Sequence, residues 1–318
     1  MILVTGGTGF IGGRLAARLA ADGRRVRVLA RGRVPFSRAG SVEFLRGDVT
    51  DADAVLRATE GADAVFHLAA YARAWAKDER VFWNVNVDGT RNVVRACEEH
   101  GIDCLVHFST ALVDTAERHV TTYQRSKAEA ESVARSRAVI VRPTRVYGPG
   151  VMNQANSVAR LIDLYRRGRF RFRIADGGAR GNYVFVDDVV DGATRAGARG
   201  TTGKVYNLGG EDATLERFLA AIARVTGKRQ FVVPLPKGAV KALAGMAELL
   251  SRLGADPAIT RGWVELLSTD WPVSSQLASR ELGYSPRGIL DGISETVRWL
   301  EAGQPAYVPS PRRQWQSA

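Results

Sequence analysis

The chain has 318 residues, of which 45% are hydrophobic and 25% charged, and its formal net charge at pH 7 is +12. This composition is typical of a globular protein with enough length to bury a core, and it excludes a chain that is disordered throughout. No apolar run approaches the roughly 20 residues that span a bilayer, and the N-terminus enters a strand without a charged leader. We therefore expect no transmembrane segment and a cytoplasmic location.

The first element is a short apolar run at residues 2–4, which predicts a buried strand, followed from Ile11 by apolar residues at helical spacing. Gly6, Gly9 and Gly12 lie between the two. Gly6 permits a sharp turn, Gly9 lets the backbone approach a pyrophosphate, and Gly12 lets the helix pack closely on the strand. Free amides at the helix start then face the phosphates. This turn predicts a dinucleotide site, although glycine turns with purely structural roles have the same appearance.

Strand-like and helix-like stretches alternate through the first half of the chain. The strands are expected at residues 25–30, 42–45, 64–68, 105–109 and 138–142. The helices are expected at residues 14–21, 52–58, 84–100 and 122–136. This alternation predicts an α/β fold with a parallel, doubly wound sheet.

A Gly/Pro cluster at residues 142–150 interrupts this rhythm. Two later strands, at 183–186 and 205–208, are expected to return to the sheet. The remaining apolar segments predict a smaller, mainly helical substrate-binding cap with helices at 215–226, 237–253 and 290–300. The expected parts are a core of residues 1–150 joined by 181–210, a cap of 151–180 and 211–308, and a loose tail of 309–318.

Arginines interleave with aromatic residues at 165–173, a pattern that also suits nucleic acid. Because Phe170 and Phe172 alternate with arginines as in a half-buried strand, we expect a solvated sheet face and no nucleic-acid partner. Cys97 and Cys104 have no His or Cys at ligand spacing, so both are interpreted as core residues and no metal site is expected.

An apolar stripe follows the predicted helix at 237–253, and we interpret it as core packing rather than as a lipid-facing surface. Its members are Val240, Leu243, Ala247, Leu250 and Leu253.

Tyr123 and Lys127 are four residues apart and so share one face of a predicted helix. A phenol has an ordinary pKa near about 10, and a nearby ammonium together with an oxidised nicotinamide favours the phenolate. Tyr123 is therefore a candidate to exchange a proton with a carbonyl or alcohol oxygen. Ser109 and Thr110 end a predicted strand, at the edge where doubly wound sheets bind ligands.

Together with Thr5 and the Gly9-Phe-Ile-Gly12 ending, these residues resemble the extended short-chain dehydrogenase/reductase family. Further stretches occur in the family's order: Gly47-Asp48-Val49, His67-Leu-Ala-Ala70, and residues 84–92, 142–150, 183–188 and 206–210. The resemblance covers about residues 1–300 and implies a Rossmann core, a nicotinamide cofactor and Tyr/Lys chemistry.

The resemblance implies catalytic roles for Tyr123, Lys127 and Thr110, with Ser109 open as the alternative hydroxyl. Lys127 is also expected to hold the nicotinamide ribose. The residues expected around the cofactor are Gly6, Gly9, Phe10, Ile11, Gly12, Arg31, Arg33, Asp48, Val49, Leu68, Ala69, Ala70, Lys127 and Pro143.

The end of the second predicted strand distinguishes the two nicotinamide cofactors. NAD enzymes usually place an acidic residue there to bind the ribose hydroxyls. Ala30 occupies that place here, followed by Arg31 and Arg33. Because an arginine can bind a 2'-phosphate bidentately, we expect NADP(H) to be preferred over NAD(H).

NADP(H) favours net reduction, since the family's sugar-nucleotide epimerases and dehydratases commonly hold NAD tightly. Those enzymes commonly carry Arg-Asp-Phe or Arg-Asp-Tyr where this chain has Arg180-Gly-Asn-Tyr183. A diphosphate anchor is therefore in doubt, although Arg145 or Arg180 remains a candidate. Residues 232–236, 239–250 and 280–286 resemble the dihydroflavonol-reductase and 3-beta-hydroxysteroid-dehydrogenase branches, which act on bulky apolar ketones or alcohols.

We therefore expect an NADPH-dependent oxidoreductase that reduces a ketone or aldehyde of a bulky, hydrophobic small molecule, or oxidises the alcohol. The alternatives are an NAD-dependent sugar-nucleotide epimerase or dehydratase and a non-catalytic NADP-binding regulatory protein. The resemblance also implies a homodimer formed through the predicted helices at 84–100 and 122–136.

Overall fold

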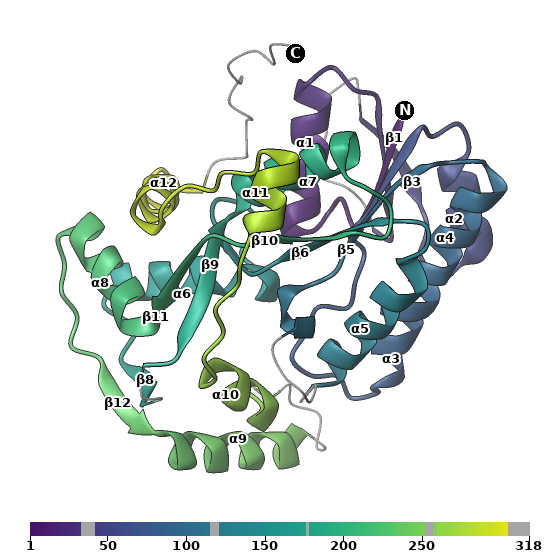
Figure 1. Cartoon of the computed structure of the whole chain (residues 1–318). Helices are drawn as coiled ribbons and strands as arrows, with labels where there is room; N and C mark the ends of the chain where they lie inside the picture. The colour runs from purple at the N-terminus through teal and green to yellow at the C-terminus, as the bar shows by residue number, and fades with distance from the viewer. Residues whose placement is uncertain (33–41, 115–120, 176–177, 252–256, 258, 305–318) are drawn as a thin grey trace.

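A seven-stranded parallel sheet forms the centre of the computed structural model, which describes residues 1–32, 42–114, 121–175, 178–251, 257 and 259–304 (Figure 1). Its strands are β1 (Ile2–Thr5), β2 (Val26–Ala30), β3 (Val42–Arg46), β4 (Ala64–His67), β5 (Cys104–Phe108), β6 (Val139–Pro143) and β10 (Val205–Leu208). They lie in the order β3-β2-β1-β4-β5-β6-β10, so the winding direction reverses between β1 and β4. Ligands of doubly wound sheets bind outside the carboxyl ends of the strands at such a reversal.

Helices cover both faces of this sheet (Figure 1). On one face lie α1 (Phe10–Ala21) and α7 (Val186–Arg199), and on the other lie α2 (Ala52–Thr59), α4 (Gly89–Glu99) and α5 (Thr122–Ala134). Neighbouring strand residues point to opposite faces, so Val4 belongs to the first core and Leu3 to the second. The predicted doubly wound α/β sheet with a mainly helical C-terminal region is confirmed.

Helix α1 begins at Phe10, four residues before its predicted start. The Gly9 amide donates to the Gly6 carbonyl at 2.9 Å, and the Gly13 amide to the Gly9 carbonyl at 2.9 Å. The glycine turn therefore closes within a few residues and passes directly into the helix.

Strand β9 (Arg180–Phe185) does not return to the main sheet, so this part of the prediction is wrong, whereas the expected strand at 205–208 is confirmed as β10. Strand β9 lies in a separate sheet between β7 (Arg145–Tyr147) and β11 (Glu211–Thr214). The reason is its aromatic side chains. Tyr183 stacks on Phe218 of α8 (Leu215–Thr226) with ring centroids 4.2 Å apart, in a second hydrophobic core.

The remaining elements pack on this second core, on the helices and strands of the main sheet, or on one another. They are α3 (Arg80–Trp83), the π-helical turn η1 (Asn84–Asp88), η2 (Ala111–Asp114), η3 (Gln154–Asn156), α6 (Ser157–Arg166), β8 (Phe172–Ala175), β12 (Val233–Pro236), α9 (Lys237–Ser251), α10 (Arg261–Leu267), α11 (Gln276–Leu282) and α12 (Ile289–Glu301). Strands β8 and β12 pair in parallel as a two-stranded sheet. None of the helices in the described ranges combines the length and apolar character needed to cross a bilayer.

Two predictions of burial in this region are wrong. Phe172 was expected on the covered side of a strand, yet it is 58% exposed, because the small β8–β12 sheet has too little protein around it to cover both sides. Leu243 and Leu250 were expected in the core, yet they are 54% and 58% exposed. Leu253, also expected there, lies outside the described residues.

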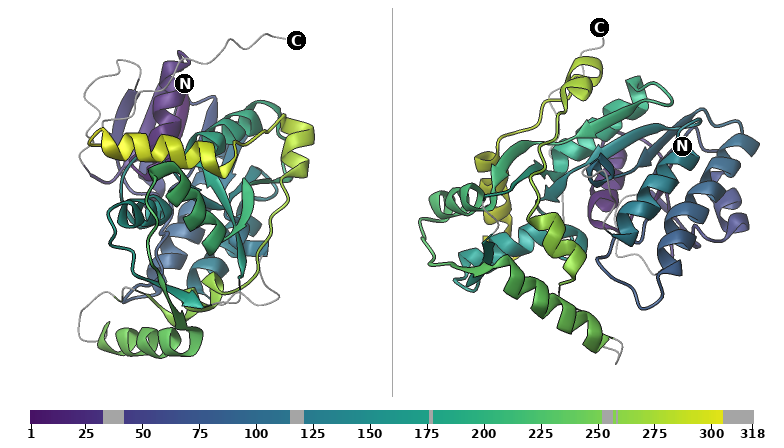
Figure 2. Two further views of the ribbon diagram at one scale, coloured as in Figure 1. Left: turned by 90° about the vertical axis from the view of Figure 1, so that its left-hand side faces the viewer. Right: turned by 60° about the horizontal axis from the view of Figure 1, so that its bottom comes forward.

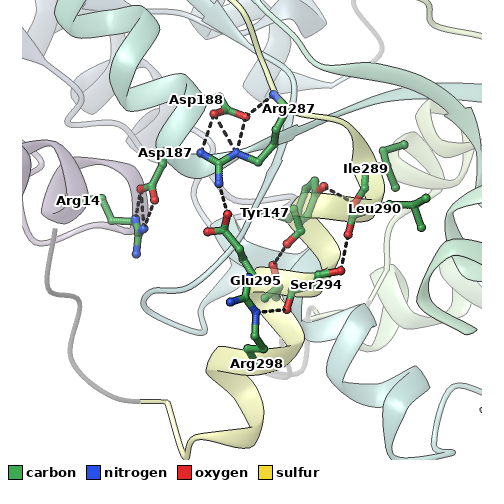
Figure 3. Close-up of polar contacts among 12 residues, drawn as sticks. Arg14, Tyr147, Asp187, Asp188, Arg287, Ile289, Leu290, Ser294, Glu295 and Arg298 are labelled. Carbon is green, nitrogen blue, oxygen red and sulfur yellow. Dashed lines mark hydrogen bonds and ion pairs between the residues drawn. The ribbon is translucent and has the colours of Figure 1, made fainter. Parts of the chain in front are cut away.

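A polar cluster attaches α12 and its preceding loop to α7 (Figure 3). The Asp188 carboxylate accepts hydrogen bonds from the Arg287 backbone amide at 2.9 Å and from its guanidinium at 3.0 Å, and Arg287 also donates to Glu295. Beside it, Arg14 of α1 donates bidentately to Asp187. These pairs hold the C-terminal helix close to the carboxyl edge of the main sheet.

Candidate active site

The glycine turn forms an open cradle, and a side chain at Gly6 or Gly12 would clash with nearby backbone atoms. Gly6 has a φ of +70°, and a Cβ there would lie 2.7 Å from the Ala69 backbone nitrogen. A Cβ on Gly12 would lie 2.2 Å from the Gly6 carbonyl oxygen. Gly9 is the N-cap of α1 and offers no side-chain cap, so the first amides of the helix are left for a ligand. The cradle fits a pyrophosphate.

The other expected cofactor residues gather along the same edge. Leu68, Ala69 and Ala70 follow β4, and the Ala69 amide donates to the Thr5 hydroxyl at 3.2 Å. Pro143 ends β6. Phe10 is 3% exposed in the core, so contact with a cofactor would come from its backbone. Ile11 is partly buried beside it.

At the end of β2, the Ala30 side chain is buried, whereas the Arg31 side chain is 76% exposed. The Arg31 Nε lies 3.8 Å from an Asp48 carboxylate oxygen, and Asp48 also accepts hydrogen bonds from the Thr50 amide and hydroxyl. Val49 is buried beside them. Arg33 lies outside the described residues. An exposed arginine, ion-paired with Asp48, thus follows directly after the position where an acid would bind ribose hydroxyls.

Helix α5 begins at Thr122, one residue before Tyr123, and its start is closed by a capping box. The Thr121 hydroxyl accepts from the Gln124 amide at 3.2 Å, and the Gln124 side chain accepts from the Thr121 amide at 3.1 Å. This Thr-x-x-Gln signature is readable in the sequence, and it fixes the helix start and therefore the direction of Tyr123.

Tyr123, Thr110 and Lys127 lie together at the end of β5. The phenol is hydrogen-bonded to the Thr110 hydroxyl. The Lys127 Nζ donates to the carbonyl of Phe108, the last residue of β5, at 2.6 Å. Lys127 is only 3% exposed. The helix therefore holds the phenol and the ammonium against the strand end that bears Thr110.

The surroundings set the protonation of both groups. Burial raises the pKa of the Tyr123 phenol to about 12, against the effect of the Thr110 hydrogen bond. Burial lowers the pKa of the Lys127 ammonium to about 8, although the Glu131 carboxylate acts in the opposite direction. At neutral pH the site thus holds a neutral phenol beside a cation, which is the state of a proton donor.

Ser109 is placed differently from Thr110. It is 5% exposed and lies beside the Glu131 carboxylate. Glu131 in turn accepts two hydrogen bonds from the Arg142 guanidinium, at 2.8 and 2.7 Å. Ser109 therefore lies next to the ion-pair network that joins α5 to β6, whereas Thr110 lies next to the phenol.

A buried polar chain behind the site was not predicted from the sequence. His67 is hydrogen-bonded to the Thr5 hydroxyl at 2.7 Å and to the Thr90 hydroxyl at 3.0 Å. Thr90 donates to the Asn86 carbonyl at 2.6 Å, and the Asn86 amide donates to the Ser126 hydroxyl at 2.9 Å. Burial, with the nearby Lys127 charge, lowers the pKa of His67 to about 3. A neutral imidazole thus links the end of β1, next to the glycine turn, to helix α5.

The π-helical turn η1 displaces the backbone around Asn86 so that this amide reaches α5. The asparagine-rich motif at residues 84–92 is visible in the sequence. The contact that Asn86 makes with Ser126, 40 residues later in the chain, is not.

The substrate side of Tyr123 is apolar. Tyr123 packs against a cluster formed by Ala111, Leu112, Trp263, Leu266, Trp271 and Val273. A cavity of about 640 Å³ opens nearby and has a mixed lining, in which Trp75, Phe82 and Leu249 lie among polar and charged side chains such as Thr122, Lys77 and Arg261.

The two arginines considered as diphosphate anchors are both engaged by protein groups. The Arg145 guanidinium lies 5.4 Å from the ring centroids of Tyr183 and Trp271, and it donates to the Tyr183 hydroxyl at 3.1 Å. Arg180 is bound bidentately by Asp270 at 3.0 and 2.8 Å.

The family model of the NAD dependent epimerase/dehydratase family matches residues 2–209, which is more than half of the chain. The chain belongs to this family. It is an NAD(P)-dependent oxidoreductase of the extended short-chain dehydrogenase/reductase type, as its motifs indicated.

Named relatives extend over most of the chain. It is 31% identical to the 2-alkyl-3-oxoalkanoate reductase of Stenotrophomonas maltophilia, covering 96% of this chain and 99% of that one. It is 28% identical to the 3beta-hydroxysteroid-dehydrogenase/decarboxylase isoform 1 of Arabidopsis thaliana, over 82% and 67% of the two chains. The UDP-glucuronic acid 4-epimerase of Bacillus cereus, crystallised with NAD, matches with a TM-score of 0.76 over 95% of this chain and 99% of that one, at 22% identity. That last likeness concerns the fold alone.

Proposed function

We propose that this protein is an NADPH-dependent reductase of a ketone or aldehyde carried by a bulky apolar molecule, and that it oxidises the alcohol in the reverse direction. The observation that carries the proposal is the neutral Tyr123 phenol, hydrogen-bonded to Thr110 on the helix that also holds the buried Lys127 against the end of β5.

In this mechanism the chain supplies the proton and the geometry. A nicotinamide held at this site would supply the hydride for the carbonyl carbon. The Tyr123 hydroxyl gives its proton to the carbonyl oxygen, while Thr110 donates a hydrogen bond that orients the same oxygen. The Lys127 charge stabilises the phenolate that remains. Gly6, Gly9 and the start of α1 would hold the pyrophosphate.

The substrate side favours an apolar compound over a sugar nucleotide. Apolar and aromatic side chains pack around Tyr123. The Arg180 guanidinium is already paired with Asp270 and is therefore not open to a diphosphate. Arg145 has no carboxylate partner among the described residues, and its position between Tyr183 and Trp271 suits a carboxylate near the ketone. The Stenotrophomonas relative is named for such an oxo acid.

We expect net consumption of NADPH when the purified protein is given a long-chain 2-alkyl-3-oxo acid, with one alcohol formed for each NADPH oxidised. The measurement follows the loss of NADPH absorbance together with product mass. UDP-glucose and UDP-glucuronic acid serve as comparison substrates. Turnover of a sugar nucleotide without net cofactor consumption, and none of any oxo compound, would show an epimerase or dehydratase instead.

The preference for NADPH is proposed to rest on Arg31. We expect Arg31→Ala to weaken NADPH binding by about tenfold to a hundredfold, because hydrogen bonds from a charged group to a 2'-phosphate are lost. NADH binding should change less than about twofold by the same reasoning. Isothermal titration with each cofactor measures both. Arg57→Ala, at an exposed position of α2, is the matched control. An equal loss for the two cofactors would contradict the role of Arg31.

Other parts of the proposal rest on the family resemblance. We propose a cofactor core of residues 1–150 joined by α7 and β10, a substrate cap of 151–180 and 211–308, and a homodimer that pairs helices α4 and α5 of two copies. A cytoplasmic location is proposed on the same basis.

A further inference from the structure

Large apolar side chains gather on one edge of the molecule. Of the nine exposed large hydrophobic side chains in the described part of the chain, six lie on or next to β8, β12 and α9. We call these six the apolar rim: Phe172, Phe231, Leu243, Met246, Leu249 and Leu250, each 54% to 82% exposed.

The elements of the apolar rim are continuous. Phe172 of β8 pairs with Val233 of β12, and α9 begins at Lys237 directly after β12 ends. The three elements form the lower edge in Figure 1, and the lower edge again in the left view of Figure 2. Phe231 lies two residues before Val233 on the same edge.

One side of α9 faces the protein and the other has no cover among the described residues. Ala244 is fully buried on the side that contacts α10. Leu243, Met246 and Leu250 are spaced by three and four residues, so they share a face of the helix that is turned away from Ala244. The helix is thus amphipathic, with its apolar face outward.

Basic side chains lie at the same edge. Four of them are exposed and form no ion pair within the described residues: Arg169, Arg171, Lys228 and Arg229. The nearby acids are already occupied, since Asp163 is paired with Arg166 and Arg167, and Glu216 is paired with Arg173. The edge therefore combines exposed apolar side chains with uncompensated positive charge.

We propose that the apolar rim docks on an anionic lipid bilayer. Leucine, methionine and phenylalanine side chains then enter the boundary between headgroups and acyl chains, and the basic side chains contact lipid phosphates. A second copy of the chain is a poorer occupant, because a two-fold interface would bring the same four cations together. Apolar patches of this kind mark interaction surfaces.

The docked edge borders the cavity beside the candidate active site. Leu249 belongs to the apolar rim and also lines the cavity of about 640 Å³, whose wall includes Thr122, the residue before Tyr123. A ketone dissolved in the bilayer has a short path into this cavity. That route rests on the proposed function, whereas the docking does not.

Co-sedimentation of the full chain with vesicles tests the docking. Vesicles of phosphatidylcholine alone are compared with vesicles that also contain phosphatidylglycerol, at low and high NaCl. We expect binding that increases with phosphatidylglycerol and decreases with salt. The double variant Leu243→Ser/Leu250→Ser should lower the partition coefficient by about tenfold. Leu290→Ser, at an exposed leucine of α12, is the control and should leave it unchanged.

Absence of binding to either kind of vesicle, or equal binding of the double variant and the wild type, would overturn the proposal. Sedimentation velocity without lipid is the second measurement. A wild-type dimer that becomes monomeric in the double variant would show that a second copy covers the rim and would also overturn it. NADPH oxidation with a water-soluble short-chain ketone is recorded in parallel. If the wild type does not oxidise NADPH with this ketone, the result counts against the proposed function and leaves the docking proposal unaffected.

Discussion

Tyr123→Phe is expected to lower kcat by about a thousandfold, because a positioned general acid contributes about 10²- to 10⁴-fold to such reactions. The substitution removes only the phenolic oxygen, and the ring keeps its packing against Leu112 and Trp271. NADPH binding should therefore change little. Steady-state turnover and a fluorescence titration of NADPH measure the two effects separately. Wild-type turnover in this variant would exclude the proposed mechanism.

The adjacent hydroxyls of Ser109 and Thr110 can be compared in the same turnover assay. Thr110→Val removes the hydroxyl that bonds the phenol and is expected to lower kcat by about a hundredfold, as for a lost oxyanion donor. Ser109→Ala should have a small effect on kcat, because Ser109 lies beside Glu131 instead. The reverse order of effects would assign the catalytic hydroxyl to Ser109.

Glu131→Gln is expected to lower the free energy of unfolding by about 3 kcal/mol. The Glu131 and Arg142 side chains are 3% and 9% exposed, and their bidentate pair joins α5 to β6. Removing the carboxylate charge leaves a buried guanidinium with Asp114 as its one acidic partner among the described residues. Guanidinium denaturation measures the change. Glu129→Gln, at an exposed position of the same helix, is the control, and an equal loss there would contradict the argument.

The same variant has a functional consequence through Lys127. Its ammonium has a pKa of about 8, and the Glu131 carboxylate raises that pKa against burial. Without the carboxylate the pKa falls, so the ammonium loses its proton at lower pH. As the pH is raised, the rate of reduction should therefore begin to fall at a lower pH in Glu131→Gln than in the wild type. A pH profile of kcat/KM measures this shift.

Much of the Rossmann core was predictable because its signals are local. The positive φ of Gly6 and the close approach at Gly12 require glycine at those positions, whatever the rest of the chain does. The alternating apolar runs set the strands and helices of the main sheet to within a few residues. The i, i+4 spacing placed Tyr123 and Lys127 on one helix face.

The second sheet was not predictable in the same way. Strand β9 has the apolar pattern of a core strand, and pattern alone does not choose between two sheets. Tyr183 and Phe185 join Tyr147 and Phe218 in a core that extends along the chain from Tyr147 to Leu300. That choice depends on which partners fold nearby.

By itself the sequence determined that this protein has a dinucleotide-binding core with a tyrosine and a lysine on one helix, because backbone geometry and helical period act over a few residues. Only the tertiary structure separated Thr110 from Ser109, joined Thr5 to Ser126 through His67, and left Leu243 and Leu250 uncovered. The physical reason is that a periodic pattern shows that a helix has an apolar face, whereas burial depends on whether a distant segment packs against it.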